Sequence, residues 1–429
     1  MQQDRDQERG TEASPLSLVS EATASAFEEA QASLERFCLA AGIEAMEALL
    51  EDEATSICGC RHGRDAERAV YRWGTAVSPV GFHGGKVGVR RPRLRGKEGG
   101  EVPLASFADL QRGDLLQAWA YELMLLGVAT RRYRRAVRLE AGDVPRQDGD
   151  GTSKSAVSRR FVAMSQAKLT DWMARDLSEL DLVVIQIDGM MVADHTLIVA
   201  LGIDSTGEKH PLAVMEGATE NAAVVRALIA DLKDRGLADD RAFLWMIDGS
   251  KALRKAIKDH FGKLALIQRC QIHKARGILE RLPPHLRAGT SKALRQAFKA
   301  ENEETGKKLL ENLARRLDQE ADGVAGAIRE GMDDMLTCVR LGLPDDLRRS
   351  LVSTNQIENL IGRVRQLCKN VRRWRNARMV KRWTVSAMIE AKKGMRRLRG
   401  YKSLPILQAA LRRHEQNVLA ELDPKARAA

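Results

Sequence analysis

Long apolar runs are missing from this chain of 429 residues, and aromatic side chains are few. Phe, Trp and Tyr together make up 4% of the residues. No apolar run approaches the ~18 residues that a membrane-spanning helix needs, so we expect no membrane partner. The first ten residues are polar and lack the apolar centre of a signal peptide. These absences predict a cytoplasmic protein.

Cysteine is also sparse and irregularly spaced. The six cysteines are Cys38, Cys58, Cys60, Cys270, Cys338 and Cys368. Scattered cysteines in a long chain argue against a disulfide framework and for a reducing compartment. Cys270 and His273 have Cys-x-x-His spacing, but a structural zinc site needs about four ligands. The group Cys58, Cys60 and His62 has poor spacing for a second pair, so zinc is only a minor alternative.

Positive charge is concentrated at one end of the chain. Residues 359–429 contain 19 Lys and Arg against 4 Asp and Glu, whereas residues 1–358 contain 51 against 54. A basic block of this kind attracts the phosphate backbone of nucleic acids. The alternative is a solvated helical surface or a basic tail. Because acidic candidates for a metal site directly precede the block, we favour nucleic acid and expect a nucleoid-associated protein.

The order of apolar runs predicts an α/β core over residues 179–282. Three strands at 182–188, 196–204 and 209–217 have short connections, the first at Gly189, and should form an antiparallel meander. A helix at 221–236, a strand at 242–248, a helix at 251–261, a strand at 264–270 and a helix at 273–282 follow. The meander, and the lack of a Gly-x-Gly-x-x-Gly sequence after the first strand, exclude a doubly wound dinucleotide fold. The order resembles a ribonuclease-H-like core, in which the fourth strand lies beside the first.

We interpret residues 179–282 as the first part of a catalytic core, and five further regions precede or follow it in the sequence. They are a helical N-terminal region at 1–75 that could support dimerisation, a DNA-binding region with a β-hairpin and a helix-turn-helix-like element at 76–178, a helical insertion at 283–345, the second part of the core at 346–395, and a basic helical tail at 396–429.

Three acids are the candidates for chemistry. Asp188 and Asp248 each end an apolar run that is predicted to be a strand, and Glu358 lies just ahead of the basic block. Carboxylates at one edge of a sheet can hold two divalent cations for phosphoryl transfer. Taken singly, the two Asp-Gly pairs could be ordinary turns, and Glu358 a surface acid. The strand order favours the metal site over the rival acids Asp194, Asp204 and Glu216.

Basic residues in three segments are candidate phosphate contacts. The predicted hairpin has arginines at alternate positions, among them Arg90 and Arg93, although an exposed edge kept soluble by charge explains them equally well. A capped helix near residues 152–161 resembles a recognition helix and has Lys154, Arg159 and Arg160, although a packing helix is the alternative. After Glu358, several arginines are expected on one helical face: Arg363, Arg365, Arg372 and Arg373. His273 could position a phosphate or water, or simply begin a helix.

Several segments together resemble one family. They are Ile-Asp-Gly at 187–189, Asp-Gly-Ser-Lys-Ala-Leu at 248–253, Gln-Arg-Cys-Gln-Ile-His-Lys-Ala-Arg at 268–276, Ser-Thr-Asn-Gln-Ile-Glu at 353–358, the segment 151–159, and Asn-Val-Arg-Arg-Trp at 370–374. In order and spacing the chain resembles the mutator-type transposases of bacterial insertion sequences, which belong to the DDE superfamily.

The resemblance implies a ribonuclease-H-like core with a helical insertion between the second Asp and the Glu. It also implies cleavage and strand transfer of double-stranded DNA at terminal inverted repeats, a target DNA, and Mg²⁺ or Mn²⁺ held by Asp188, Asp248 and Glu358. The family's Cys-x-x-His element corresponds to Cys270 and His273. Pairing of two DNA ends suggests a homodimer or larger assembly. The alternatives are a nuclease of the same fold without strand transfer, and a non-catalytic DNA-binding regulator.

Overall fold

The computed structural model describes residues 21–63, 67–112, 114–137, 151–218, 221–321 and 323–422. The chain forms two compact units. The first contains Met1–Met124 and Val128–Met164, and the second contains Leu125–Gly127 and Ser165–Ala429. No helix among the described residues is both long and apolar enough to cross a lipid bilayer.

The first unit packs one long helix on a small antiparallel sheet. Helix α1 (Glu21–Cys58) lies against β1 (Val70–Phe82) and β2 (Gly85–Gly96), and β3 (Glu101–Val102) pairs with the other side of β2. The predicted hairpin exists as the short β2–β3 pair. The prediction missed β1, the longer partner of β2, and it assigned the start of β1 to a helical region. Gly74 and Pro79 interrupt the strand pattern of β1, which hid it.

Short helices complete this unit. They are α2 (Ala105–Gln111), α3 (Asp114–Leu125), α4 (Tyr133–Val137) and the beginning of α5 (Lys154–Ala174). Helix α5 starts close to its predicted position, and the Ser153 hydroxyl accepts a hydrogen bond from the Ala156 N–H at 3.3 Å, as an N-cap residue does. The turn of the predicted helix-turn-helix falls in residues 138–150, outside the described part of the chain.

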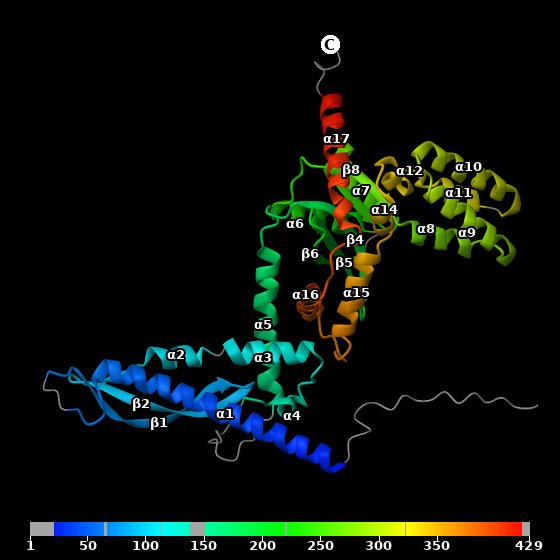
Figure 1. The fold of residues 1–429 in the computed structure, drawn as a ribbon. Helices are drawn as coiled ribbons and strands as arrows, with labels where there is room; N and C mark the ends of the chain where they lie inside the picture. The colour runs from blue at the N-terminus through cyan, green and yellow to red at the C-terminus, as the bar shows by residue number, and fades with distance from the viewer. Residues whose placement is uncertain are drawn as a thin grey trace, which may run out of the picture. The chain divides into compact units, whose positions relative to one another are not determined.

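The second unit contains a mixed five-stranded sheet (Figure 1). Its strands are β4 (Leu182–Val192), β5 (His195–Asp204), β6 (Lys209–Glu216), β7 (Phe243–Ile247) and β8 (Ala265–Arg269), in the spatial order β6-β5-β4-β7-β8. The first three pair antiparallel, whereas β7 pairs parallel with β4 and with β8. The predicted meander, and the predicted neighbours β4 and β7, are thereby confirmed.

Strand β4 is longer than predicted. Gly189 is not the turn between the first two strands, because it pairs with Ile198 inside the sheet. The turn is Ala193–Asp194, where Ala193 has a φ of 50°. Burial explains the difference: Met190 and Val192 are 2% and 7% exposed, so the apolar face of the strand continues beyond Asp188. Asp188 therefore lies within β4 and not at its end.

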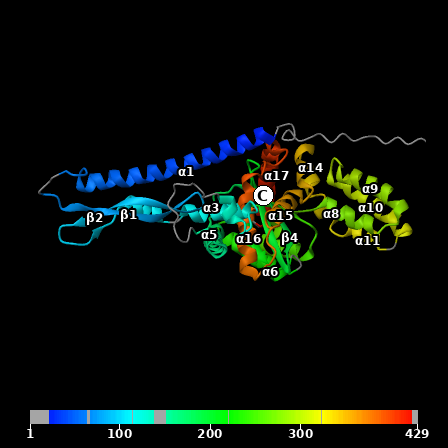
Figure 2. The ribbon, with the colours of Figure 1, turned by 90° about the horizontal axis from the view of Figure 1, so that it is seen from below.

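Helices cover both faces of the sheet (Figure 2). Helices α6 (Ala222–Asp234) and α7 (Lys251–Phe261) pack on the face that includes Ile185 and Trp245. Helices α14 (Asp345–Leu351) and α17 (Leu404–Leu422) pack on the opposite face, with Val184 and Leu244.

Helix α17 corrects the prediction of a basic tail. The segment is helical, as expected, but Leu404, Leu407 and Leu411 are at most 4% exposed and belong to the core. Their helical spacing was obscured in the sequence by the surrounding basic residues.

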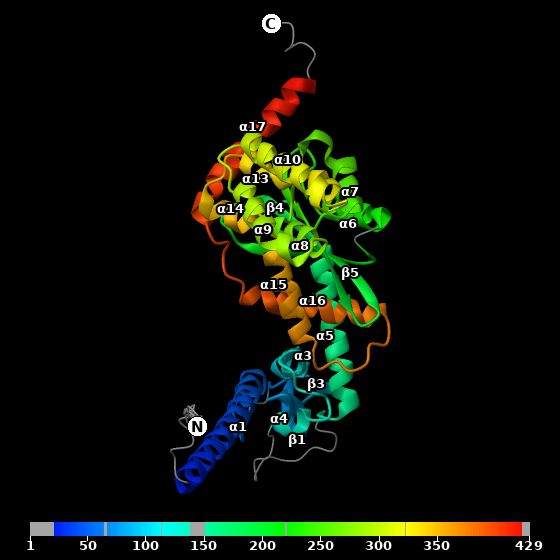
Figure 3. The ribbon, with the colours of Figure 1, turned by 90° about the vertical axis from the view of Figure 1, so that its right-hand side faces the viewer.

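A helical segment follows β8. It contains α8 (Gln271–Glu280), α9 (Pro284–Phe298), α10 (Glu303–Glu320), α11 (Val324–Arg329), α12 (Met332–Met335) and α13 (Thr337–Arg340). Leu294, Leu310 and Ile328 belong to a core of its own. After α14 come α15 (Asn355–Leu367) and α16 (Ala377–Lys393), which cross each other (Figure 3). The helical character predicted for this stretch is confirmed.

Candidate active site

Asp188 lies within β4, and Asp248 directly follows the last residue of the neighbouring strand β7. In the parallel pair of β4 and β7, Gln186 is opposite Met246. Asp188 and Asp248 each come two residues later, so their side chains leave the same face of the sheet. Neighbouring strands are about 4.8 Å apart. The structure therefore brings these two carboxylates side by side.

Each of the two aspartates has one carboxylate oxygen bound by the backbone. The Gly189 N–H donates to Asp188 Oδ1 at 2.8 Å, and the Ser250 N–H donates to Asp248 Oδ1 at 3.0 Å. Gly249 has a φ of 118°, and a Cβ there would lie 2.2 Å from Arg269 Nε. Only glycine fits this turn after β7, which fixes the position of Asp248.

Glu358 lies in the first turn of α15, close enough to influence Asp188. Burial, together with the negative charges of Asp248 and Glu358, raises the pKa of Asp188 to about 6 against the opposing Gly189 hydrogen bond. The Thr354 hydroxyl donates to Glu358 Oε1 at 2.7 Å. Glu358 itself is 44% exposed.

Buried Gln186 attaches the Glu358 helix to the sheet. Its Oε1 accepts from the Ile357 N–H at 3.0 Å, and its Nε2 donates to Gln356 Oε1 at 2.8 Å. Gln186 is fully buried and precedes Asp188 by two residues on the same face. The residue that holds the start of α15 is thus a near neighbour of Asp188, which explains how Glu358 approaches the two aspartates although 110 positions separate it from Asp248.

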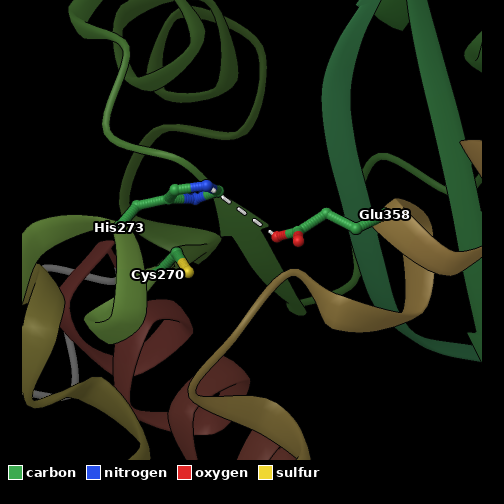
Figure 4. Close-up of side chains that lie close together, drawn as sticks. All are labelled: Cys270, His273 and Glu358. Atoms are coloured by element: carbon green, nitrogen blue, oxygen red, sulfur yellow. Dashed lines mark ion pairs between the residues drawn. The ribbon is translucent and has the colours of Figure 1, made fainter. Parts of the chain in front are cut away.

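Cys270 and His273 lie close to Glu358 (Figure 4). The potential ligand atoms of Cys270, His273 and Glu358 all lie within 4.8 Å of one another. His273 Nε2 is 3.9 Å from Glu358 Oε1, while its buried Nδ1 has no hydrogen-bond partner. Cys270 is the N-cap residue of α8 and is 1% exposed. His273 lies in the first turn of that helix, so it is a helix-start residue that also faces the acids.

The only other such ligand group in the described part of the chain is Asp204, Glu208 and His210. Asp204 Oδ1 accepts from the N–H groups of Thr206 and Glu208, and Asp204 Oδ2 is 2.8 Å from His210 Nε2. These bonds close the turn between β5 and β6. The carboxylate oxygens of Asp188, Asp248 and Glu358 do not all lie within 4.8 Å of one another.

The chemistry of the three acids suits a divalent cation. Asp188 and Asp248 have no ion-pair partner among the residues that the structure describes, although Asp188 is largely buried. Mutual repulsion between buried carboxylates is costly unless a cation neutralises it. Carboxylate oxygens are the ligands that Mg²⁺ and Mn²⁺ prefer. The residues therefore fit the metal that the sequence predicted.

The raised pKa of Asp188 predicts a pH-dependent stability in metal-free protein. The folded protein binds a proton more tightly than the unfolded chain between pH 3.8 and about 6. This contribution is fully present below the unfolded pKa and is lost as pH rises through the folded pKa. We expect Asp188→Asn to be more stable than wild type above pH 6 by about 3 kcal/mol, with no gain below pH 4. Urea unfolding of both proteins below pH 4 and at pH 7 measures the difference in stability. Equal stability of the two proteins at pH 7 would contradict the prediction.

Comparison with known proteins identifies the family. The family model described as "Transposase, Mutator family" matches residues 17–395. The chain belongs to the Mutator family of transposases. It is 28% identical over 241 residues to a probable insertion-sequence transposase of Corynebacterium diphtheriae, covering 54% of this chain and 69% of the relative. It is 25% identical over 380 residues to the ISRM5 transposase of Rhizobium meliloti (strain 1021), covering 85% and 92%.

A third similar protein is the transposase of IS256 in transposon Tn4001 of Staphylococcus aureus. The identity is 27% over 303 residues, which cover 67% of this chain and 72% of the relative.

In this Mutator-family transposase, some candidate DNA contacts of the first unit are exposed, whereas others already form bonds within the protein. Lys154 and Arg159 are exposed on α5, whereas Arg160 Nη1 donates to the Gly151 carbonyl at 2.6 Å. Arg90 is exposed, but Arg93 pairs with Glu101 at 3.1 Å. Strand β2 pairs with β3 only at Leu94 and Arg95, so the alternative of a sheet edge kept soluble by charge stays open for Arg90 and Arg93.

The arginines after Glu358 do not share one helical face. Arg363 and Arg365 are on α15, but the helix ends at Leu367, and Arg372 and Arg373 lie in the irregular segment before α16. Arg363 Nη1 donates to the Ala391 carbonyl at 3.3 Å, so it joins α15 to α16. Arg365, Arg372 and Arg373 are exposed. The basic spacing suggested one continuous helix and missed its end.

Two buried glutamines were missed by sequence reasoning. Besides Gln186, Gln268 on β8 is fully buried. Its Oε1 accepts from the Cys338 N–H at 2.9 Å, and its Nε2 donates to the Met335 carbonyl at 3.0 Å. It therefore anchors the chain where it leaves the helical segment. A lone glutamine inside an apolar strand was the available signal, since a buried amide needs partners.

Proposed function

We propose that this chain is a DNA transposase that cuts and joins DNA strands with the acids Asp188, Asp248 and Glu358. The observation that carries the proposal is the position of Asp188 beside Asp248 in the register of β4 and β7, with Glu358 near enough to raise the pKa of Asp188. The strand order supports a ribonuclease-H-like core, with the helices between β8 and α15 as its insertion.

The chain's own residues would have separate tasks. Asp188 and Asp248 would hold Mg²⁺ or Mn²⁺ at the sheet edge, and Glu358 would complete the set from α15. Divalent ions, when bound, neutralise charge on the scissile phosphate and activate the attacking oxygen. Gln186 would keep Glu358 in place through the start of α15. His273, 3.9 Å from Glu358, would orient that carboxylate.

The proposed reaction has two phosphoryl transfers. In the first, water attacks a phosphodiester at a terminal inverted repeat, the P–O bond to the leaving 3′-oxygen breaks, and a free 3′-OH results. In the second, this 3′-OH attacks a phosphodiester of target DNA, forming a new P–O bond and releasing the target's own 3′-oxygen. Because two ends must be joined to one target, we propose that a homodimer or larger assembly acts.

The test uses a plasmid that contains the DNA flanking the gene on both sides. We expect cleavage at the element ends that requires Mg²⁺ or Mn²⁺ and is abolished by a chelator, followed by joined products. Cleavage without joining would favour the nuclease alternative. Binding without cleavage would favour the DNA-binding regulator.

A metal titration tests the site without DNA. At a free Mn²⁺ concentration a hundred times its Kd, a ligand that binds only folded protein stabilises it by about 2.7 kcal/mol. We expect wild type to gain stability in this way and Asp248→Asn to lose most of the gain. The control is Asp240→Asn, an exposed aspartate with no ion-pair partner among the described residues. Equal gains in wild type and Asp248→Asn would contradict the metal assignment.

A further inference from the structure

A cavity of about 600 Å³ opens beside Asp248. One wall consists of Gly249 and Ser250, which directly follow Asp248, together with helix α7. The opposite wall comes from the loop between α11 and α12, which contains Glu330. This cavity belongs to the second unit and contains none of the three candidate metal-binding acids.

Helix α7 presents a basic face to this cavity. Lys251, Arg254, Lys255 and Lys258 line it and are all exposed. They follow the spacing i, i+3, i+4 and i+7, which places them on one side of a helix. On the other side of α7, Leu253, Ala256 and Ile257 are fully buried against the sheet. The basic face therefore has a fixed orientation.

Two of these lysines have no counter-charge. Arg254 is bound by Asp334, and Lys251 is 3.4 Å from Glu330. Lys255 and Lys258 have no ion-pair partner within the described ranges. From Lys251 to Lys258 the helix rises about 10 Å, which corresponds to roughly three nucleotides of one DNA strand.

Glu330 is surrounded by more positive charge than one carboxylate neutralises. Its oxygens lie 3.4 Å from Lys251 Nζ, 3.5 Å from Lys274 Nζ and 3.8 Å from Arg269 Nη1. The side chains of Lys274 and Arg269 are only 6% and 16% exposed, whereas that of Glu330 is 44% exposed. Glu330, an exposed acid in a loop, therefore forms ion pairs with Lys274 and Arg269, whose side chains are largely buried.

We propose that this cavity binds backbone phosphates of DNA next to the cleavage site, and that Glu330 occupies the same cations in the DNA-free protein. Lys255 and Lys258 contact phosphate directly, and Arg269 and Lys251 exchange Glu330 for it. The position beside Asp248 rests on the proposed function. The contacts are to phosphate, so they are independent of base sequence.

The first experiment measures the salt dependence of binding to a fixed DNA duplex in the absence of divalent metal. Each phosphate contact contributes about 0.9 to the slope of log K against log salt. We expect Lys255→Gln/Lys258→Gln to reduce the slope by about 1.8. The matched control is Lys308→Gln/Arg316→Gln on α10, which removes two exposed cations without ion-pair partners in the described structure. Equal slopes for the two double variants would overturn the proposal.

The second experiment changes the acid. Glu330→Gln removes the internal competitor, so we expect DNA binding to tighten by about tenfold at low salt. Unchanged or weaker DNA binding by folded Glu330→Gln would count against the proposal that Glu330 competes with phosphate for these cations. The same preparations are assayed for cleavage. A smaller slope without any cleavage by wild type would support the cavity and reject the proposed function, whereas normal cleavage with equal slopes would reject the cavity alone.

Discussion

Asp188→Asn is expected to reduce metal-dependent DNA nicking by at least about a thousandfold while leaving DNA binding nearly unchanged. A metal clamp contributes several kcal/mol to phosphoryl transfer, and each 1.36 kcal/mol changes the rate by about tenfold. Asparagine keeps the size of the side chain but lacks the negative charge. Asp188 is next to Asp248 on the neighbouring strand and near Glu358, so the amide would weaken the whole set.

The control for this variant lies in the same hairpin. Asp194 is an exposed residue of the turn that follows β4, and Asp194→Asn makes the same chemical change six residues away. We expect it to nick DNA at the wild-type rate. The assay follows plasmid nicking in Mn²⁺, with duplex binding measured in parallel. Full nicking by Asp188→Asn would rule out its proposed role.

Gln186→Met is expected to lower both stability and nicking, even though it leaves all three acids in place. Methionine has a similar volume, but it leaves the Ile357 N–H and the Gln356 amide without their buried partner. An unsatisfied buried group costs about 1–3 kcal/mol. Because the lost bonds position Glu358, we expect nicking to fall by about 10- to 100-fold, as for residues that orient metal ligands.

Gln268→Met separates positioning from stability. Gln268 is equally buried and forms a similar pair of bonds, to Cys338 and Met335, but it anchors α13 and not α15. We expect a comparable loss of unfolding free energy and a much smaller loss of nicking at a temperature where both variants are folded. Equal nicking by the two variants would show that Gln186 acts only through stability.

The sequence was sufficient to place Asp188 beside Asp248, because the strand order alone makes β4 and β7 neighbours. It was not sufficient to find the end of β4, since Gly189 resembles a turn residue and only burial of Met190 and Val192 shows that the strand continues. Strand patterns predicted the meander because its strands are apolar and separated by short turns.

The approach of Glu358 could not be derived from local patterns. It depends on hydrogen bonds between Gln186 and residues 170 and 171 positions later, and such pairings leave no periodicity in the sequence. The packing of α17 was missed because basic residues lie on both sides of its buried leucines, Leu404, Leu407 and Leu411. The cavity beside Asp248 likewise forms only when the α11–α12 loop approaches α7.

The long separation between Gln186 and Ile357 has a consequence for how the protein is made. A chain emerging from the ribosome can form β4 and β7, and so bring two acids together, long before residue 358 exists. Until α15 arrives, the Gln186 amide lacks its bonds to Gln356 and Ile357, and until α17 follows, Val184 and Leu244 are only partly covered. The complete acid set is therefore a property of the finished chain. On the proposed mechanism, a chain that ends before residue 358 would contain two of the three acids and would leave DNA intact.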